Sequence, residues 1–183
     1  MVAFDIGTGT GVLTAILAKR GFNHVIGTDQ SQRAIDCALD NLSRLNLLNL
    51  DSVKVEIIKA DLFPEGLASL IVCNPPWLPG RASSSIDHAI YDENNKMLLG
   101  FLNGLAKHLE PEGEGWLIMS DLAEHLGLRA HSELMQAIQK ANLSVIGKLQ
   151  TRPHHPKSQD QSDPLHFARA AEVTTLWRLA RAT

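Results

Sequence analysis

Short apolar runs alternate with longer amphipathic segments along most of this chain. Five runs have the length and composition of buried strands, at residues 2–6, 24–29, 53–58, 67–73 and 116–119. Apolar residues recur at helical spacing over residues 11–20, 31–45, 97–109 and 132–141, with Ser31 as a predicted N-cap and residues 110–113 as the predicted end of the third helix. This alternation predicts an α/β fold, with a mostly parallel sheet and helices on both faces.

The end of the chain has a different pattern. Residues 143–149 and 172–179 are rich in β-forming residues and predict two strands that pair as an antiparallel hairpin. Residues 151–169 are rich in Pro, His, Gln, Asp and Ser and follow no period. We expect a long loop there, a kind of segment that is often a functional lid. Residues 79–85 form a second predicted flexible stretch, placed to close over a substrate.

Length and composition narrow the class of protein. The 183 residues suit a single domain covering residues 1–183. Because the first strand begins at residue 2, we expect this domain to be the C-terminal part of a longer protein. The 17 Lys and Arg against 20 Asp and Glu give a formal net charge of -3, which favours neither a nucleic-acid surface nor a membrane surface. Cys37 and Cys73 lack metal-ligand spacing and no apolar run approaches the ~20 residues of a membrane span, so we expect a cytoplasmic protein without a metal.

A glycine-rich turn, Asp5-Ile6-Gly7-Thr8-Gly9-Thr10-Gly11, joins the first strand to the first helix, where backbone N–H groups point at a ligand. A dinucleotide fingerprint would need its third glycine at Val12, which argues against NAD. Asp5 would repel a pyrophosphate but attract the ammonium of an amino-acid-like cofactor whose carboxylate meets the loop amides. S-adenosylmethionine carries both groups. The predicted residues of an S-adenosylmethionine site are Asp5, Gly7, Thr8, Gly9, Thr10 and Gly11. The alternative is a plain strand-to-helix turn.

Two acidic residues follow the next strands and complete the predicted cofactor site. Asp29 ends the second strand, where a carboxylate can accept hydrogen bonds from both ribose hydroxyls; a helix N-cap is the alternative role. Asp61 follows the third strand at the same edge of the sheet. This position places its carboxylate near an adenine amine and Leu62 against the adenine ring. A turn-forming role before Pro64 is the alternative for Asp61.

The four residues Asn74-Pro75-Pro76-Trp77 directly follow the apolar run Leu70-Ile71-Val72-Cys73. Two prolines cannot continue a sheet ladder, so they end the strand and present Asn74 and Trp77 at its carboxyl end. A planar nitrogen is a poor nucleophile because its lone pair is delocalised, and accepting both of its N–H groups aims that lone pair at a methyl donor. The Asn74 oxygen and the Pro75 carbonyl are the predicted acceptors, and Trp77 would stack on the planar group. A structural turn with a core Trp is the alternative.

Taken together, these motifs resemble the class I S-adenosylmethionine-dependent methyltransferases. Asn74-Pro75-Pro76-Trp77 resembles the Asn-Pro-Pro-aromatic signature of enzymes that methylate planar nitrogen. The resemblance covers roughly residues 2–120, includes Asp61-Leu62-Phe63 and Tyr91-Asp92, and points to the small-domain enzymes that include the glutamine methyltransferases of release factors and a ribosomal protein. Trp77 stands where that group usually has Tyr, and we expect the N-terminal recognition domain of the group to lie outside the given sequence.

The resemblance implies a doubly wound, Rossmann-like fold with a seven-stranded sheet whose last strand is antiparallel. It implies catalysis by Asn74, Pro75, Pro76 and Trp77, with Asn74 also contacting the cofactor S-adenosylmethionine, and S-adenosylhomocysteine as a product. The implied partner is a protein substrate, a translation factor or ribosomal protein, methylated on a glutamine amide. Two alternatives stay open: methylation of an exocyclic amine of adenine or guanine in RNA or DNA, and a non-catalytic scaffold that binds S-adenosylmethionine.

Other residues give weaker indications. Trp116 and Trp177 lie in strand patterns and are predicted core residues. Asp121, after the fifth strand, either faces the pocket or caps the next helix. Tyr91-Asp92-Glu93 forms either a substrate-side loop or a plain turn. The histidines and serines of the two predicted loops show no metal or hydrolase pattern and are expected to be solvated: His154, His155, Ser83, Ser84 and Ser85.

Overall fold

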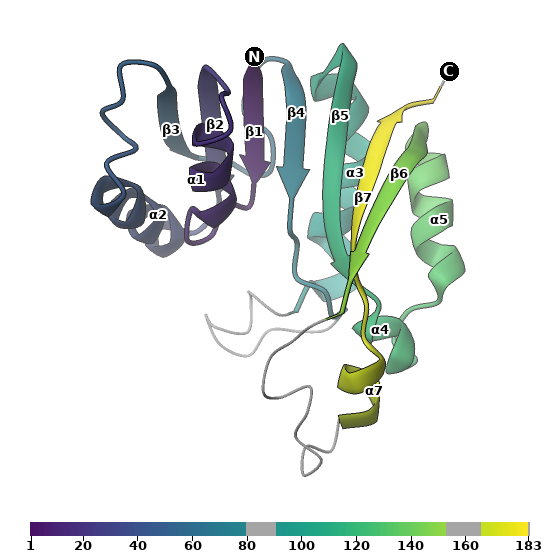
Figure 1. Cartoon of the computed structure of the whole chain (residues 1–183). Helices are drawn as coiled ribbons and strands as arrows, with labels where there is room; N and C mark the ends of the chain where they lie inside the picture. Colours follow the sequence, from purple (N-terminus) through teal and green to yellow (C-terminus); the bar gives the residue numbers. More distant parts are fainter. Residues whose placement is uncertain (80–90, 153–165, 183) are drawn as a thin grey trace.

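The computed structural model of the chain describes residues 1–79, 91–152 and 166–182. These residues build a seven-stranded sheet in the order β3-β2-β1-β4-β5-β7-β6. The strands are β1 (Val2–Ile6), β2 (His24–Asp29), β3 (Lys54–Lys59), β4 (Ala68–Cys73), β5 (Leu109–Ser120), β6 (Leu143–Thr151) and β7 (Thr174–Arg181). Strands β1 to β5 pair in parallel, whereas β7 is antiparallel to both β5 and β6 (Figure 1). The predicted doubly wound fold, with its seven strands and antiparallel last strand, is confirmed.

Helices cover both faces of the sheet (Figure 1). On one face lie α1 (Val12–Ala18) and α2 (Gln32–Arg44), and on the other α3 (Lys96–His108) and α5 (His131–Lys140). The Oγ of Ser31 accepts from Ala34 N at 3.4 Å, so the predicted N-cap of α2 is confirmed. Three short helices, η2 (Glu93–Asn95), α4 (Leu122–His125) and α7 (His166–Ala171), lie near the carboxyl ends of the strands.

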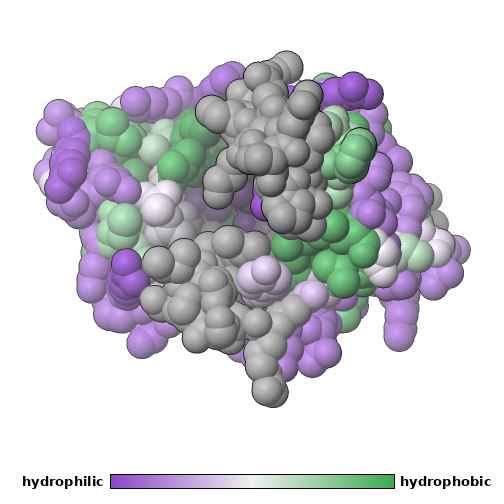
Figure 2. Space-filling model, turned by 90° about the horizontal axis from the view of Figure 1, so that it is seen from below, coloured by the Kyte–Doolittle hydropathy of each residue, from purple (hydrophilic) through white to green (hydrophobic). Residues whose placement is uncertain are grey.

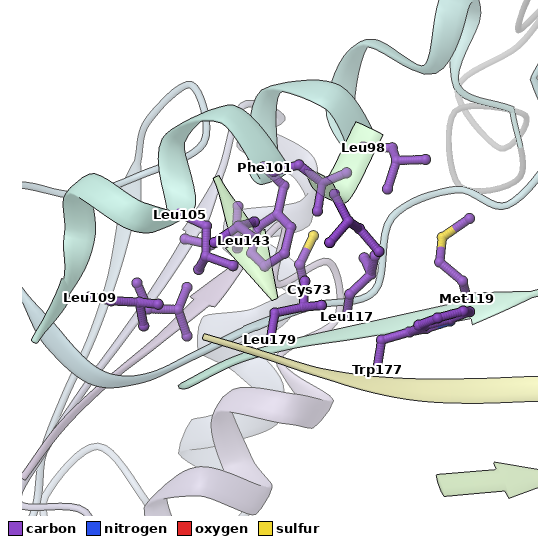
Figure 3. Close-up of a cluster of buried hydrophobic side chains, with 14 of the residues drawn as sticks. Cys73, Leu98, Phe101, Leu105, Leu109, Leu117, Met119, Leu143, Trp177 and Leu179 are labelled. Carbon is purple, nitrogen blue, oxygen red and sulfur yellow. The ribbon is translucent and has the colours of Figure 1, made fainter. Parts of the chain in front are cut away.

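The sheet separates two apolar clusters. Ala3 packs with α1 and α2, whereas the next residue, Phe4, packs with α3, because successive strand side chains point to opposite faces. Trp177 is a core residue, as predicted, but Trp116 is half-buried on the other face, and its indole N–H donates to Glu114 Oε2 at 2.8 Å. Figure 3 shows the α3 side, where the α3 side chains Leu98, Phe101 and Leu105 pack with side chains of the strands, among them Cys73, Leu117 and Leu179.

Two predicted elements differ from the structure and the short helices η2 and α4 were not predicted, while the other predicted helices and strands agree to within about two residues. β5 begins at Leu109 rather than residue 116, because residues 110–113 continue as strand directly after α3 ends. The register of β5 against β4 is irregular there, which tolerates Pro111 within the strand. The predicted loop over residues 151–169 is wrong at both ends: Thr151 belongs to β6, and α7 begins at residue 166.

Candidate active site

The predicted site residues lie at the edge of the sheet where β1, β2, β4 and β5 end (Figure 1). The order of the strands reverses between β1 and β4, and open α/β sheets bind ligands in the crevice at such a point. The register pairs Ile6 with Cys73, so Gly7 and Asn74 are the first residues beyond two neighbouring strands. Figure 2 shows this edge from below, with a hydrophilic hollow near its centre. The glycine turn and the Asn-Pro-Pro-Trp motif therefore leave the sheet side by side.

The glycine turn has the backbone that its sequence predicts. Gly7, Gly9 and Gly11 have φ angles of 71°, 56° and 82°, in the left-handed region that other residues rarely adopt. Thr8 N donates to a carbonyl of β2 at 2.8 Å, which fastens the turn to that strand. A Cβ at Gly11 would lie 3.2 Å from Ala38 of α2, whereas a Cβ at Gly9 would meet no atom of the described residues closer than 3.9 Å. Gly9 thus borders open space in which a ligand can lie.

Asp5 is completely buried behind this turn. Its Oδ2 accepts from Thr8 Oγ1 at 2.8 Å, from Thr14 N at 2.9 Å and from Thr14 Oγ1 at 2.8 Å. Burial raises the pKa of the Asp5 carboxyl, and the hydrogen bonds from Thr8 and Thr14 oppose that rise. Its Oδ1 is buried and has no partner among the residues that the structure describes. Asp5 therefore shapes the turn through one oxygen, while the other still needs a donor; its contact with a cofactor ammonium stays a prediction.

Asp29 ties the glycine turn to the start of α2. Its Oδ2 accepts from Gly9 N at 3.1 Å, and its Oδ1 accepts from Ser31 N at 2.9 Å. The carbonyl of Thr10 accepts from Asn41 Nδ2 of the same helix, at 2.9 Å. The half-buried carboxylate of Asp29 thus lies beside Gly9, the residue that borders open space.

Asp61 and Leu62 follow β3 at the same edge. Asp61 is exposed, and Gln30 Nε2 donates to its Oδ1. Leu62 has a φ of 73°, and Thr28 Oγ1 donates to its carbonyl at 2.5 Å. The Leu62 side chain approaches α3 so closely that a Cβ at Gly100 would lie 2.5 Å from Leu62 Cδ1. The contact of Leu62 with α3 and the position of Gln30 could not be foreseen from the sequence, and the adenine contact stays a prediction.

The Asn-Pro-Pro-Trp motif directly follows β4. Asn74 is exposed, Pro75 is buried, and Pro76 and Trp77 are half-buried. Trp77 Nε1 donates to Asn74 Oδ1 at 3.0 Å, a contact within the motif that the sequence did not predict. The indole also packs against the apolar cluster on the α3 side. The motif therefore presents an amide oxygen that holds one donor and has a second lone pair for the N–H of a methyl acceptor.

Asp92 fastens the segment after this motif to α3. Its carboxylate is buried and accepts from Met97 N at 2.9 Å and from Leu98 N at 3.0 Å. Its own N–H donates to the carbonyl of Leu78 at 2.8 Å. Met97 lies over the glycine turn, because a Cβ at Gly7 would clash with Met97 Cε. Asp92 thus acts at the start of a helix, and it brings Met97 to the cofactor side of the site.

Asp121, after β5, holds the beginning of β7. Its Oδ1 accepts from Val173 N at 2.7 Å, and its Oδ2 lies 3.4 Å from His125 Nε2.

Predictions for residues 80–85, His154 and His155 lie outside the described residues. Within the three described ranges, no three His, Cys, Asp or Glu side chains gather as a metal site. Across the same ranges, no helix combines the length and apolar character that crossing a membrane requires.

Comparison with known proteins places this geometry in a family. The family model described as methyltransferase small domain matches residues 2–144. A protein of Methanocaldococcus jannaschii, named provisionally as a protein N5-glutamine methyltransferase, is 28% identical over 126 residues, which are 64% of this chain and 61% of that protein. A ribosomal protein L11 methyltransferase of Clostridium perfringens is 35% identical over 75 residues, which are 38% of this chain and 24% of that protein. The chain thus spans less than two thirds of either relative.

Solved structures agree with the fold. A S-adenosylmethionine-dependent methyltransferase of Thiobacillus denitrificans, crystallised with S-adenosylhomocysteine, superposes with a TM-score of 0.63 at 15% identity. The superposition covers 98% of this chain and 84% of that one. The chain belongs to the methyltransferase small domain family, and its fold is that of the S-adenosylmethionine-dependent methyltransferases.

Proposed function

We propose that this chain transfers a methyl group from S-adenosylmethionine to a planar nitrogen. The observation that carries the proposal is the register of β1 and β4, which starts the glycine turn and the Asn-Pro-Pro-Trp motif side by side. The first of these segments borders space that the described residues leave open beside Gly9, as a cofactor site requires. The second offers hydrogen-bond acceptors, as an N–H group requires. Membership of the methyltransferase small domain family supports the same reaction type.

The residues around the glycine turn fit this cofactor. Asp5 Oδ1 is buried without a donor among the described residues, so an ammonium that reaches it would satisfy this acid, and the space beside Gly9 would take the rest of the cofactor. Asp29 and Asp61 offer carboxylates to the ribose hydroxyls and the adenine amine. When bound, the cofactor supplies an electrophilic methyl group on a sulfonium.

Asn74 and Pro75 would orient the methyl acceptor. Asn74 Oδ1 keeps a lone pair beyond the one that receives the indole N–H, and the Pro75 carbonyl is a second acceptor. Holding both hydrogens of a planar amino group directs the nitrogen lone pair at the methyl group and stabilises the positive charge that grows on nitrogen. The acceptor nitrogen would gain the methyl group as the bond between sulfur and that group breaks, and would then lose one proton to solvent. No base is needed before transfer, because this proton becomes acidic only when the nitrogen carries the methyl group.

We propose a glutamine amide of a translation factor or ribosomal protein as the acceptor. The provisional name of the M. jannaschii relative supports glutamine, and the C. perfringens relative is named for a ribosomal protein. The net charge of -3 disfavours the phosphate contacts that dominate binding to nucleic acid. Incubating the purified chain with cell extract and methyl-labelled S-adenosylmethionine tests this acceptor. Label that protease removes supports it, and label that nuclease removes rejects it.

The substitution Asn74→Ala tests the reaction itself. We expect turnover to fall by about 10²-fold, the cost of one oriented polar group in a transition state, while cofactor affinity changes little because the glycine turn and Asp29 share the binding. Asn49→Ala, in an exposed turn before β3, is the matched control. Equal turnover of Asn74→Ala and the parent chain would contradict the mechanism, and cofactor binding without labelling of any acceptor would favour a scaffold.

A further inference from the structure

A second polar cavity lies at the same edge of the sheet, beyond β5. Its volume is about 80 Å³, which is room for roughly five waters or one small polar group. It is bounded by the carboxyl end of β5, by the residues before α5 and by β6 and β7, and its polar lining includes Arg129, Lys148, Gln150 and Thr175. None of these side chains takes part in the site described above.

Arg129 lines this cavity, and two of its side-chain N–H groups lack an acceptor among the described residues. Its side chain is 6% exposed, and Nη2 donates to the carbonyl of Ser120 at 3.3 Å. Its Nε and Nη1 are buried and have no hydrogen-bond partner among the described residues. A buried donor without an acceptor costs free energy, so each such group in a native protein calls for an explanation. An acceptor supplied from outside the chain reaches these buried atoms when the Arg129 side chain turns towards the cavity that it lines.

The charges that line the cavity are balanced. Arg129 and Lys148 are matched by Asp121 and Glu124, and the Lys148 ammonium lies 3.9 Å from the centre of the Trp177 ring. Burial lowers the pKa of the Arg129 guanidinium, whereas the charge of Glu124 raises it. The guanidinium therefore lacks acceptor atoms but not counter-charge. An anion would add negative charge next to two carboxylates, while a carbonyl oxygen supplies an acceptor alone.

We propose that this cavity is a subsite for an uncharged amide carbonyl of the methyl acceptor, which donors of Arg129 bind. The proposal rests on the proposed function, because it takes the acceptor to be a peptide. Cys73 of β4 pairs with Leu117 of β5. Asn74 is the next residue after Cys73, and Met119, which lines the cavity, is the second residue after Leu117. Neighbouring strands are about 4.8 Å apart, so the cavity begins next to the Asn-Pro-Pro-Trp motif. At ~3.5 Å per extended residue, a peptide bound at the motif reaches Arg129 within a few residues.

N-methylacetamide, a minimal peptide group, tests the subsite without any turnover. We expect it to shift the Arg129 Nε–H signal in proton–nitrogen correlation spectra, a signal identified by its loss in Arg129→Met. Acetate and inorganic phosphate also offer oxygen acceptors, but these oxygens are negatively charged. We expect both anions to bind more weakly than N-methylacetamide. Arg44→Met, which removes an exposed arginine paired with Asp40, is the matched control and is expected to bind N-methylacetamide like the parent.

Arg129→Met is also expected to keep or raise the melting temperature, because it removes a buried charge with unsatisfied donors. Stronger binding of acetate or phosphate than of N-methylacetamide would overturn the proposal, as would equal N-methylacetamide binding by Arg129→Met and the parent. A large loss of stability in both Arg129→Met and Arg129→Lys would assign the guanidinium a structural role instead.

A kinetic measurement separates this subsite from the proposed function. With acetyl-Ala-Gln-Ala-N-methylamide as acceptor, we expect Arg129→Met to raise KM by about tenfold, the loss of hydrogen bonds to a charged donor, with a smaller change in kcat. Propionamide, which has no flanking carbonyl, should be methylated equally by both chains. An unchanged KM for the peptide would reject the subsite. If no chain methylates either acceptor, the proposed function fails while the N-methylacetamide spectra still decide the subsite.

Discussion

The indole N–H of Trp77 donates to Oδ1 of Asn74 at 3.0 Å, within a turn that two prolines hold between them. The bond determines which end of the Asn74 amide is the oxygen and where it points. One lone pair of that oxygen is used by the indole, and the other remains for a methyl acceptor. We therefore expect Trp77 to act through Asn74 as a positioning residue, in addition to any contact it makes with the acceptor.

The substitution Trp77→Phe keeps an aromatic ring but removes the indole donor. We expect kcat to fall about fivefold, the worth of one neutral hydrogen bond, because the Asn74 amide can then rotate away from its working orientation. Cofactor affinity should stay unchanged, since the glycine turn and Asp29 are untouched. Steady-state kinetics and calorimetric titration with S-adenosylmethionine measure the two quantities separately.

Trp116→Phe is the matched control for this prediction. It also removes an indole donor, which binds Glu114 Oε2 at 2.8 Å on the other face of the sheet. We expect this variant to keep the kcat of the parent chain. Equal kcat values for Trp77→Phe and Trp116→Phe would show that the bond to Asn74 has no part in the reaction.

Alanine substitutions at Gly9 and Gly21 separate the effect of backbone strain from the effect of lost space for a ligand. Both have positive φ, 56° and 86°, and a Cβ at Gly21 would meet nothing within 4 Å. Alanine at either position should cost about 1 kcal/mol of folding free energy, because both force a left-handed backbone on a side chain. Only Gly9→Ala should also weaken S-adenosylmethionine binding, since its methyl group enters the open space beside the turn. Urea unfolding and cofactor titration of both variants test this, and equal cofactor affinities would count against the turn as the binding site.

Local pattern was sufficient to predict most of the fold. β1 and β2 are short runs bounded by turns, and the glycines after β1 predicted the tight turn between strand and helix, whose left-handed backbone the structure adds. β5 was predicted too short because residues 110–113 are polar and include a proline, and they join the sheet only through an irregular pairing with β4. That pairing depends on a distant segment, which periodicity cannot report.

The contacts of the candidate site were less predictable than its residues. The positions of Asp29 and Asn74 at strand ends follow from the order of strands and turns. Two hydrogen bonds, from Gly9 N to Asp29 and from Trp77 to Asn74, depend on side-chain rotamers within packed loops. Arg129 is the extreme case, because arginine side chains are mostly exposed, whereas tertiary packing buries this one.

Asp5 should make stability depend on pH in an unusual direction. Burial raises the pKa of its carboxyl above the ordinary value of 3.8, with the Asp29 charge adding to the rise, so the folded chain binds this proton more tightly than the unfolded chain. Its contribution to stability is fully present below pH 3.8 and is lost as pH rises through the folded pKa. Relative to Asp5→Asn, the parent should therefore gain stability as pH falls through this range. Urea unfolding of both chains at several pH values measures the difference, and a constant difference would contradict the burial argument.

Glu114 should show the opposite dependence. Arg178 of β7 donates to its carboxylate from Nε at 2.8 Å and from Nη2 at 2.5 Å, and this bonding lowers the Glu114 pKa below 4.5. The pair joins β5 to β7, and its contribution to stability is present above pH 4.5 and lost as pH falls through the lowered pKa. Glu114→Gln should therefore unfold at a lower temperature than the parent at pH 7, with the two melting temperatures converging in acid. Melting curves of the two chains from pH 7 downward test this, and a difference that persists at the acid end would mean that packing rather than charge joins the two strands.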